Sequence, residues 1–297
     1  MGIRRSGMKQ QGEKNLEAQK SHKRGKTVRL VIVSIVVWVI AILYFSPIGY
    51  MFLTAFKTEY QAVTPSLIFT PTLETLKKVL SDRTMLGYVK NSLFQVVLGT
   101  GFSLVLGVPA AFALVFGKFK KKTTNDKAYF WFITTILLPP VAILVPLYIL
   151  YQRLNLINSS FGLLLVYVGF HVPIVVWMLH SFLYDVPIEI MEAAEIDGCT
   201  RFQQLVKIAV PLARSGIMTA GLLVAVFIWN EFFLAFNLTG NTTATLPVYM
   251  ARFREQQGMF VAQLSASSMI AVLPPIILGW FTQKSLVKGL TLGAVKG

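Results

Sequence analysis

The sequence predicts an all-α polytopic membrane protein with six transmembrane helices. Apolar residues make up 55% of its 297 residues and charged residues only 14%, whereas soluble domains carry about 25% charged residues. The apolar residues gather in runs of about 20 or more, the length that an α-helix needs to cross a bilayer. A polar interval at residues 184–211 separates the fourth run from the fifth and carries signals for two short helices.

The first apolar run, residues 28–51, follows a basic segment at residues 1–27. This segment contains almost no apolar residues, so its composition favours a disordered tail. No small-residue cleavage site follows the run, which indicates an uncleaved first span rather than a signal peptide.

Five further apolar runs predict the remaining spans. Glycine and proline interrupt three of them, as at Pro139-Pro140 and Pro274-Pro275. Because broken helices line the pathways of transporters, these interruptions favour a transporter over a simple anchor. The runs cover residues 91–116, 128–151, 161–183, 212–236 and 264–281.

The distribution of Lys and Arg predicts the orientation in the membrane. Six crossings place both ends of the chain on one side, together with the loop 118–127 and the interval 184–211. Twenty of the 28 Lys and Arg residues belong to that side and eight to the other, and positive residues are retained in the cytoplasm. The net charge of +15 is thus explained by topology at a lipid membrane, not by nucleic acid. We expect a cell-membrane protein with a basic cytoplasmic tail (1–27), a six-helix domain (28–283) and a cytoplasmic C-terminal tail (284–297).

The polar interval predicts two short helices around a tight corner. Pro187 suits the first turn of a helix, and Gly198 suits the left-handed position just past a helix end. Thr200 and Gln203 form a T-x-x-Q capping box for a second helix, which Pro211 closes.

Small residues mark the first of these two helices. Ala194 and Gly198 stand four residues apart on one face, with Ala193 beside them. Because small side chains leave the backbone accessible, another surface could approach this helix closely.

No motif for nucleotide binding, metal binding or hydrolysis occurs in the sequence. It lacks G-x-x-x-x-G-K-[ST], H-E-x-x-H, G-x-S-x-G and any cluster of Cys and His. We therefore expect no catalytic, cofactor-binding or metal-binding residue in this chain. If ATP powers its function, the ATPase is another chain.

Asn230 and Glu231 place polar groups in the fifth apolar run. A carboxylate at membrane depth costs at least ~2.5 kcal/mol and faces a cavity or a partner. The pair therefore either lines a pathway or pins a neighbouring helix through hydrogen bonds.

Two other functional classes are compatible with parts of the sequence. An intramembrane enzyme could use Glu231 and His171, and it would act without an ATPase, but no second acidic or nucleophilic motif supports it. A scaffold or receptor could bind a regulator through residues 187–210, and co-purification with an ATPase would distinguish it from a transporter.

Two segments carry a resemblance to a known family. The first includes Glu192-Ala193-Ala194, Gly198, and Ile208 and Leu212 around Val210-Pro211, and it resembles the EAA loop of importer-type ABC permeases. The second is the end of the chain, residues 283–297, which resembles the terminal signature of the smaller permease of maltose-type carbohydrate importers. The whole resemblance covers residues 28–297.

The resemblance implies the type I ABC importer permease fold and a set of partners. The chain would form half of a heterodimeric pathway for a sugar, such as an oligosaccharide, with a second homologous permease. Two cytoplasmic ATPase subunits would bind ATP and Mg, and an extracytoplasmic sugar-binding protein would deliver the solute. The alternative within this family is a permease for a non-sugar solute such as an amino acid or peptide. The C-terminal signature argues against this alternative.

The resemblance also assigns roles to residues, with residues 187–210 as the link to the ATPase. For the loop 237–263, contact with the binding protein and a plain connector remain equal alternatives. Implied ATPase-coupling residues are Glu192, Ala193, Ala194, Asp197 and Gly198 in the loop, and Leu290, Gly293, Lys296 and Gly297 in the tail. Implied binding-protein contacts are Asn241, Arg252, Arg254 and Gln256.

Overall fold

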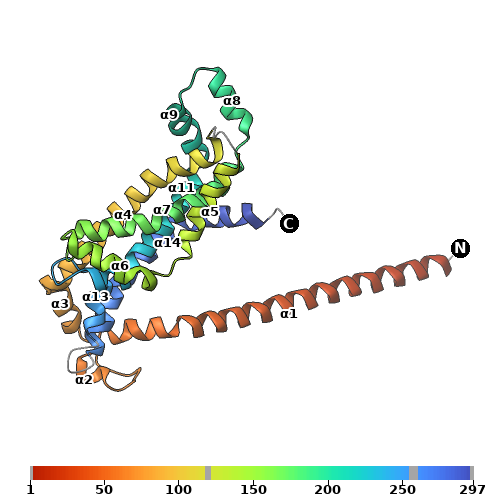
Figure 1. Ribbon diagram of the computed structural model, residues 1–297. Helices are drawn as coiled ribbons and strands as arrows, with labels where there is room; N and C mark the ends of the chain where they lie inside the picture. The colour runs from red at the N-terminus through yellow and green to blue at the C-terminus, as the bar shows by residue number, and fades with distance from the viewer. Residues whose placement is uncertain (1–2, 118–121, 254–259, 295–297) are drawn as a thin grey trace. The chain divides into compact units, whose positions relative to one another are not determined.

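The computed structural model describes residues 3–117, 122–253 and 260–294, and it describes side chains for residues 29–117, 124–251, 253 and 260–280. Every regular element in these described ranges is a helix (Figure 1). The chain forms two compact units, Met1–Thr54 and Ala55–Gly297.

The first unit is one long helix, α1 (Ile3–Thr54). Its second half, from Arg29 to Thr54, is apolar enough to cross a membrane. The basic segment, for which composition favours disorder, continues this helix toward the N-terminus. Lys, Arg, Gln and Glu are good helix formers, and extending an existing helix is far easier than nucleating one.

The second unit holds the remaining helices, and Figure 1 shows α8 and α9 at one end of its bundle and α2, α3 and α13 at the other. The elements are α2 (Glu59–Ala62), α3 (Glu74–Ser81), α4 (Arg83–Phe116), α5 (Lys122–Ile136), α6 (Pro140–Arg153), α7 (Ser160–Tyr184), α8 (Ile188–Ile196), α9 (Arg201–Gln204), a π-helical turn (Leu205–Ala209), α10 (Val210–Leu212), α11 (Arg214–Asn230), α12 (Phe233–Leu238), α13 (Leu246–Arg252) and α14 (Val261–Ala294).

Among the described residues, four helices are long and apolar enough to cross a membrane, and the number is six if each of two bent pairs is one span. In the first pair, α5 and α6 meet at 91°. The bend falls at the predicted Pro139-Pro140 interruption, because proline cannot donate a helical hydrogen bond and clashes with the preceding turn. In the second pair, the helix Arg201–Leu212 meets α11 at 81°.

Close packing of α4 against α7 and α11 forms the core of the bundle. A Cβ atom added to Gly107 of α4 would come close to Val175 of α7, and one added to Gly99 would meet Ile228 of α11 at 2.7 Å. Membrane helices pack through such small residues because lipid supplies no hydrophobic force between helices.

Two carboxylates brace the end of the bundle where α2, α3 and α13 lie. Glu59 accepts hydrogen bonds from the backbone N–H groups of Ala262 and Gln263, at 3.0 and 2.9 Å, and so caps the first turn of α14. Asp82 caps α4 and accepts a 2.8 Å hydrogen bond from the Tyr249 hydroxyl of α13.

The Asp82–Tyr249 contact shifts the pKa of both groups. Burial opposes ionisation of Asp82, but hydrogen bonds from Tyr249 and from Thr84 outweigh it and lower the pKa of this carboxyl. Burial and the bond to Asp82 raise the pKa of Tyr249, so its hydroxyl remains the donor.

Candidate functional site

The corner between α8 and α9, residues 187–204, is built by local backbone chemistry. Helix α8 begins after Pro187, and the backbone turns left-handed at Gly198, where φ is +79°. The N–H of Cys199 donates to the carbonyl of Ala194 at 2.9 Å, and the N–H of Gly198 donates to Glu195 at 3.1 Å. This pair of bonds is a Schellman motif, which confirms the predicted helix end.

The capping box at the start of α9 is also confirmed. The N–H of Gln203 donates to the Thr200 hydroxyl at 3.3 Å, and the Gln203 side chain accepts from the N–H of Thr200 at 2.8 Å. After α9 the chain continues through the π-helical turn to Pro211, so the second helix spans three short pieces.

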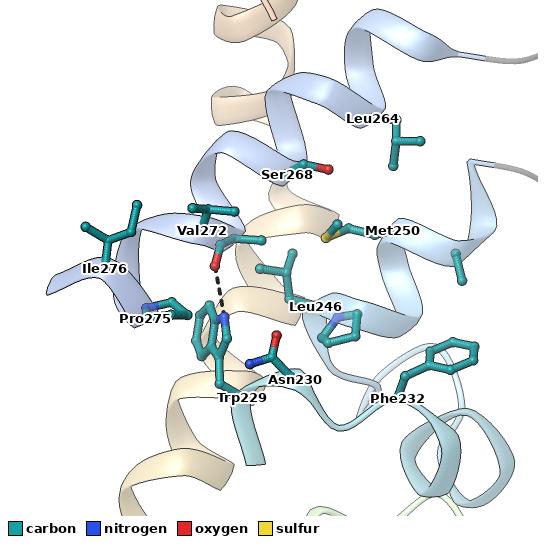
Figure 2. Close-up of a pocket in the computed structure, with 13 residues that line it drawn as sticks. Trp229, Asn230, Phe232, Leu246, Met250, Leu264, Ser268, Val272, Pro275 and Ile276 are labelled. Atoms are coloured by element: carbon teal, nitrogen blue, oxygen red, sulfur yellow. Dashed lines mark hydrogen bonds between the residues drawn. The ribbon is translucent and has the colours of Figure 1, made fainter. Parts of the chain in front are cut away.

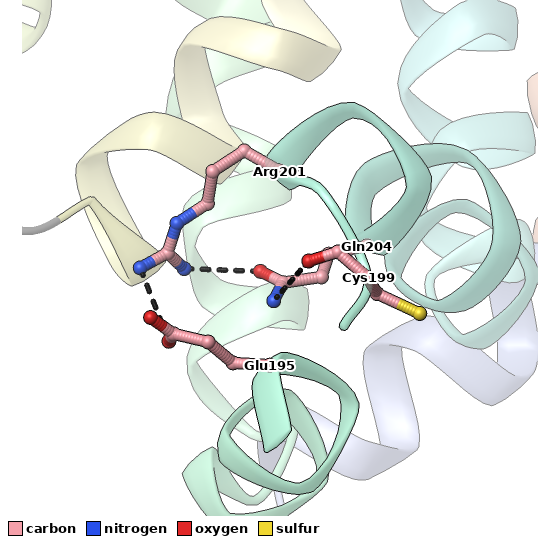
Figure 3. Close-up of polar contacts among 4 residues, drawn as sticks. All are labelled: Glu195, Cys199, Arg201 and Gln204. Atoms are coloured by element: carbon pink, nitrogen blue, oxygen red, sulfur yellow. Dashed lines mark hydrogen bonds and ion pairs between the residues drawn. The ribbon is translucent and has the colours of Figure 1, made fainter. Parts of the chain in front are cut away.

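Side chains clamp the two helices of the corner together (Figure 3). Arg201 of α9 lies 3.5 Å from the carboxylate of Glu195 on α8 and donates to Gln204 at 3.0 Å. The buried amide of Gln204 in turn donates to the carbonyl of Cys199 at 3.5 Å. The ion pair is half-exposed and contributes at most about 1 kcal/mol, but the connected contacts hold α8, the corner and α9 as one piece.

Exposure divides the residues implied in ATPase coupling. Glu192, Ala193, Asp197 and Gly198 are exposed. Ala194 is only 6% exposed because it packs against its own chain. Its small size therefore serves packing inside this chain, and the expectation that it leaves the backbone open to another surface is wrong for this residue.

Two apolar side chains at the corner are exposed, which the sequence had not led us to expect. Ile196 is 86% exposed and Phe202 is 72% exposed, one on each side of Gly198. Their exposure makes these two side chains candidates for contact with a partner. Their position beside the left-handed glycine was the available signal, because residues at a sharp corner project outward.

Glu231 lies at the break between α11 and α12, not inside a continuous fifth span. Its backbone is extended, and its carboxylate accepts hydrogen bonds from the N–H groups of Leu234 and Ala235, at 2.8 and 3.1 Å. It also accepts a 2.8 Å bond from the hydroxyl of Tyr167 on α7. Glu231 therefore caps α12 and pins it to a neighbouring helix, as one of its two predicted interpretations states. The predicted span 212–236 ends early because these bonds favour a new helix start over continuation.

The surroundings of Asn230 differ from those of Glu231. It is exposed and lines a cavity of about 900 Å³ between α11, α13 and α14 (Figure 2). Its side-chain N–H donates to the carbonyl of Val226 at 2.8 Å. The neighbouring Trp229 is buried and donates its indole N–H to the carbonyl of Ala271 at 2.9 Å. In a regular helix this carbonyl would bond the N–H of residue 275, which is proline.

Replacing Trp229 with Phe is therefore expected to destabilise the protein by about 0.5–1.5 kcal/mol, because the partly buried Ala271 carbonyl loses its donor. The melting temperature of the purified protein in detergent measures the effect. Trp177→Phe is the matched control, since Trp177 is exposed on α7. Equal shifts in melting temperature for the two variants would show that the indole hydrogen bond of Trp229 does not stabilise the protein.

The remaining predicted residues lie at the edges of the described structure. Asn241 is exposed in the turn after Gly240, whose N–H donates to Asn158 at 2.9 Å. Arg252 ends α13, and its side chain, like residues Arg254 and Gln256, lies outside the described residues. Helix α14 continues through Leu290 and Gly293, whose side chains are not described, and Lys296 and Gly297 lie outside the described residues.

The two histidines whose side chains the structure describes make ordinary contacts with neighbouring residues. Nδ1 of His171 lies 2.6 Å from the carbonyl of Tyr167, and the ring of His180 stacks on Tyr129 with centroids 3.8 Å apart. In the part of the chain that the structure describes, no group of three His, Cys, Asp or Glu residues could hold a metal ion. These contacts give no support to an intramembrane active site.

The chain is similar to known proteins over most of its length. A family model described as a binding-protein-dependent transport system inner membrane component matches residues 85–287. The sulfoquinovosyl glycerol transport system permease protein of Agrobacterium fabrum is 33% identical over 277 residues, which is 92% of this chain and 95% of that protein. The diacetylchitobiose uptake system permease protein of Streptomyces coelicolor is 31% identical over 256 residues, 84% of this chain and 91% of that protein.

A solved structure shares the fold. It is a chain of a bacterial ABC transporter involved in the import of the acidic polysaccharide alginate, with a TM-score of 0.74 and 21% identity. The match covers 88% of this chain and 97% of that chain.

Proposed function

The chain belongs to the family of binding-protein-dependent transport system inner membrane components, and on this basis we propose that it is the permease subunit of an ATP-driven carbohydrate importer. Its fold is that of a type I ABC importer permease. It is a multi-pass membrane protein, and as a permease subunit it is not itself an enzyme. The relatives named for sulfoquinovosyl glycerol and diacetylchitobiose favour a sugar over an amino acid or peptide.

We propose that the working transporter contains other chains. A second, homologous permease completes the pathway, and two cytoplasmic ATPase subunits bind ATP and Mg. An extracytoplasmic binding protein delivers the sugar, in keeping with the dependence on a binding protein that the family description states. The end of α14 and the residues after it extend the contact with the ATPases. Deleting residues 290–297 should therefore reduce sugar-stimulated ATP hydrolysis. Unchanged hydrolysis would show that the tail takes no part in coupling.

The observation that carries the coupling proposal is the exposed corner at residues 187–204, whose two helices are joined by local hydrogen bonds and an ion pair. It stands at one end of the bundle, and its Schellman turn, capping box and side-chain clamp resist bending. It is attached to α7 on one side and, through α10, to α11 on the other. A partner that grips α8 can therefore move two core helices together, which is how closure of the ATPases would open the pathway outward.

The proposed orientation places this corner in the cytoplasm, in agreement with the distribution of Lys and Arg. Cys199 is the only cysteine of the chain and lies in the corner. A membrane-impermeant maleimide should label it in inside-out vesicles and leave it unlabelled in intact cells. Labelling from outside the cell would place the corner beyond the reach of any ATPase.

The solute class is tested with the binding protein of the same transport system. Isothermal calorimetry against a panel of mono- and oligosaccharides, amino acids and short peptides should give tight binding of a saccharide only. Tight binding of an amino acid or peptide, with no saccharide binding, would favour the alternative solute class.

A further inference from the structure

The cavity between α11, α13 and α14 lies at a place where two helices lose regular hydrogen bonding. Helix α11 stops at Asn230, where the backbone becomes extended, and α14 contains Pro274 and Pro275. At membrane depth, non-helical backbone is tolerated where it is buried in protein or lines a water-filled cavity. Helix breaks around a central site are also how transporters build their pathways.

Polar groups face this cavity although it belongs largely to the membrane domain. Figure 2 shows the Asn230 amide and the Ser268 hydroxyl at different sides of the space, with Phe232 along one edge. The Asn230 N–H bond to Val226 leaves its amide oxygen available as an acceptor. An exposed amide facing lipid would be costly, so a polar occupant is the favoured explanation.

The remaining lining restricts the chemistry of that occupant. The described residues that line the cavity are apolar apart from Trp229, Asn230 and Ser268, and they include no Asp, Glu, Lys, Arg or His. An amino acid would bring an ammonium and a carboxylate, which would find no charged partner there. A sugar ring instead presents hydroxyls that match an amide and a hydroxyl, and C–H faces that pack on Phe232, which is 38% exposed.

We propose that this cavity is part of the pathway for a neutral carbohydrate, with Asn230 and Ser268 as hydrogen-bonding residues and Phe232 as an apolar wall. The inference rests on the proposed sugar-import function and deepens it, because it gives this chain direct contact with the solute. Few polar groups make the contact weak, which suits a site that a solute must leave as readily as it enters. Helix α13 covers one side of the cavity and belongs to the proposed outer loop, so the site would receive sugar soon after the binding protein releases it.

The test uses the complete importer reconstituted in vesicles, in a Cys199→Ser background. Single cysteines replace Asn230, Ser268 or, as a control, Val105, which is exposed on the outer surface of α4. The water-soluble thiol reagent 2-(trimethylammonium)ethyl methanethiosulfonate should modify N230C and S268C at least about tenfold faster than V105C, because thiolates form in water and not in lipid. Equal, slow modification at all three positions would show that lipid or a partner helix fills the cavity, and would overturn the proposal.

A second readout tests the solute itself. The saccharide selected by calorimetry, presented with its binding protein and ATP, should slow modification of N230C and S268C and leave V105C unchanged. Asn230→Ala should lower kcat/KM for transport of that saccharide by about three- to tenfold, the effect of losing one hydrogen bond. Fast modification without protection would mean that the cavity is wet but carries no sugar.

The two proposals fail in different ways in this scheme. If calorimetry finds no saccharide ligand, the sugar-import function fails. If a saccharide is transported normally by Asn230→Ala and does not protect either cysteine, only the pathway role of this cavity fails.

Discussion

Replacing Gly198 with Asn is expected to lower sugar-stimulated ATP hydrolysis by the assembled importer at least about tenfold while the chain stays in the membrane. Asn tolerates the left-handed backbone that Gly198 adopts, with φ of +79°. A Cβ atom added at Gly198 meets no other atom of this chain within 4 Å. The turn should therefore survive in G198N, and any loss of stimulated ATP hydrolysis would indicate a clash with a docked partner.

The order of the losses among three Gly198 variants distinguishes a clash with a docked partner from a failure of the corner to fold. Ala is smaller than Asn but is strained by about 1–2 kcal/mol in a left-handed conformation. Docking predicts that Gly198→Asn, and equally Gly198→Asp, loses at least about tenfold in stimulated hydrolysis and that Gly198→Ala loses less. A requirement for the turn alone predicts the reverse order. The rate of ATP hydrolysis with and without sugar-loaded binding protein measures both.

Gly87 offers a matched control for the Gly198 variants. It lies on α4 near the opposite end of the bundle, and an added Cβ atom there also meets nothing within 4 Å. Gly87→Asn should leave stimulated hydrolysis unchanged. If G198N hydrolyses ATP and transports sugar as well as G87N does, close approach at Gly198 is not part of coupling.

The second large effect is expected on stability, from removing the carboxylate of Glu231. In Glu231→Ala, the N–H groups of Leu234 and Ala235 and the hydroxyl of Tyr167 lose their acceptor together. Hydrogen bonds to charged groups contribute about 1.5–3 kcal/mol each, and losses within one network are not additive. We expect a loss of at least about 3 kcal/mol, measured as a large drop in melting temperature in detergent.

Two related variants divide this effect into its parts. Tyr167→Phe removes only the bond between helices and should lose about 1.5–3 kcal/mol. Asn230→Ala is the adjacent control for stability, because the Asn230 side chain bonds only within its own helix turn, at Val226. If E231A melts at the same temperature as N230A, Glu231 does not pin α12 to α7.

Local signals in the sequence were sufficient for the corner and for one bend. Gly198, Thr200 and Gln203 act on backbone groups within a few residues of themselves, so their roles follow from spacing alone. The same holds for Pro139-Pro140, whose missing N–H groups bend the third span wherever the rest of the chain lies.

Contacts between distant residues could not be predicted. Glu231 and Tyr167 are separated by 64 positions, and nothing in the local pattern indicates the pairing or the early end of α11, because the apolar residues continue through Phe236. Burial of Ala194 and exposure of Ile196 likewise depend on which face of α8 meets the chain. In α8, Glu189, Glu192 and Glu195 mark one polar face, but the apolar Ile196 shares it, so the pattern specifies the buried face only weakly.

The central claim is that an outside ATPase grips the corner between α8 and α9. The most direct test places a photoreactive benzoylphenylalanine at Ile196, which is 86% exposed, in the complete importer. The matched control carries it at Tyr60, which is 90% exposed beside the opposite end of the bundle. Illumination should join the chain to the ATPase subunit from position 196 and not from position 60. No adduct from 196, or the same ATPase adduct from 60, would contradict the account.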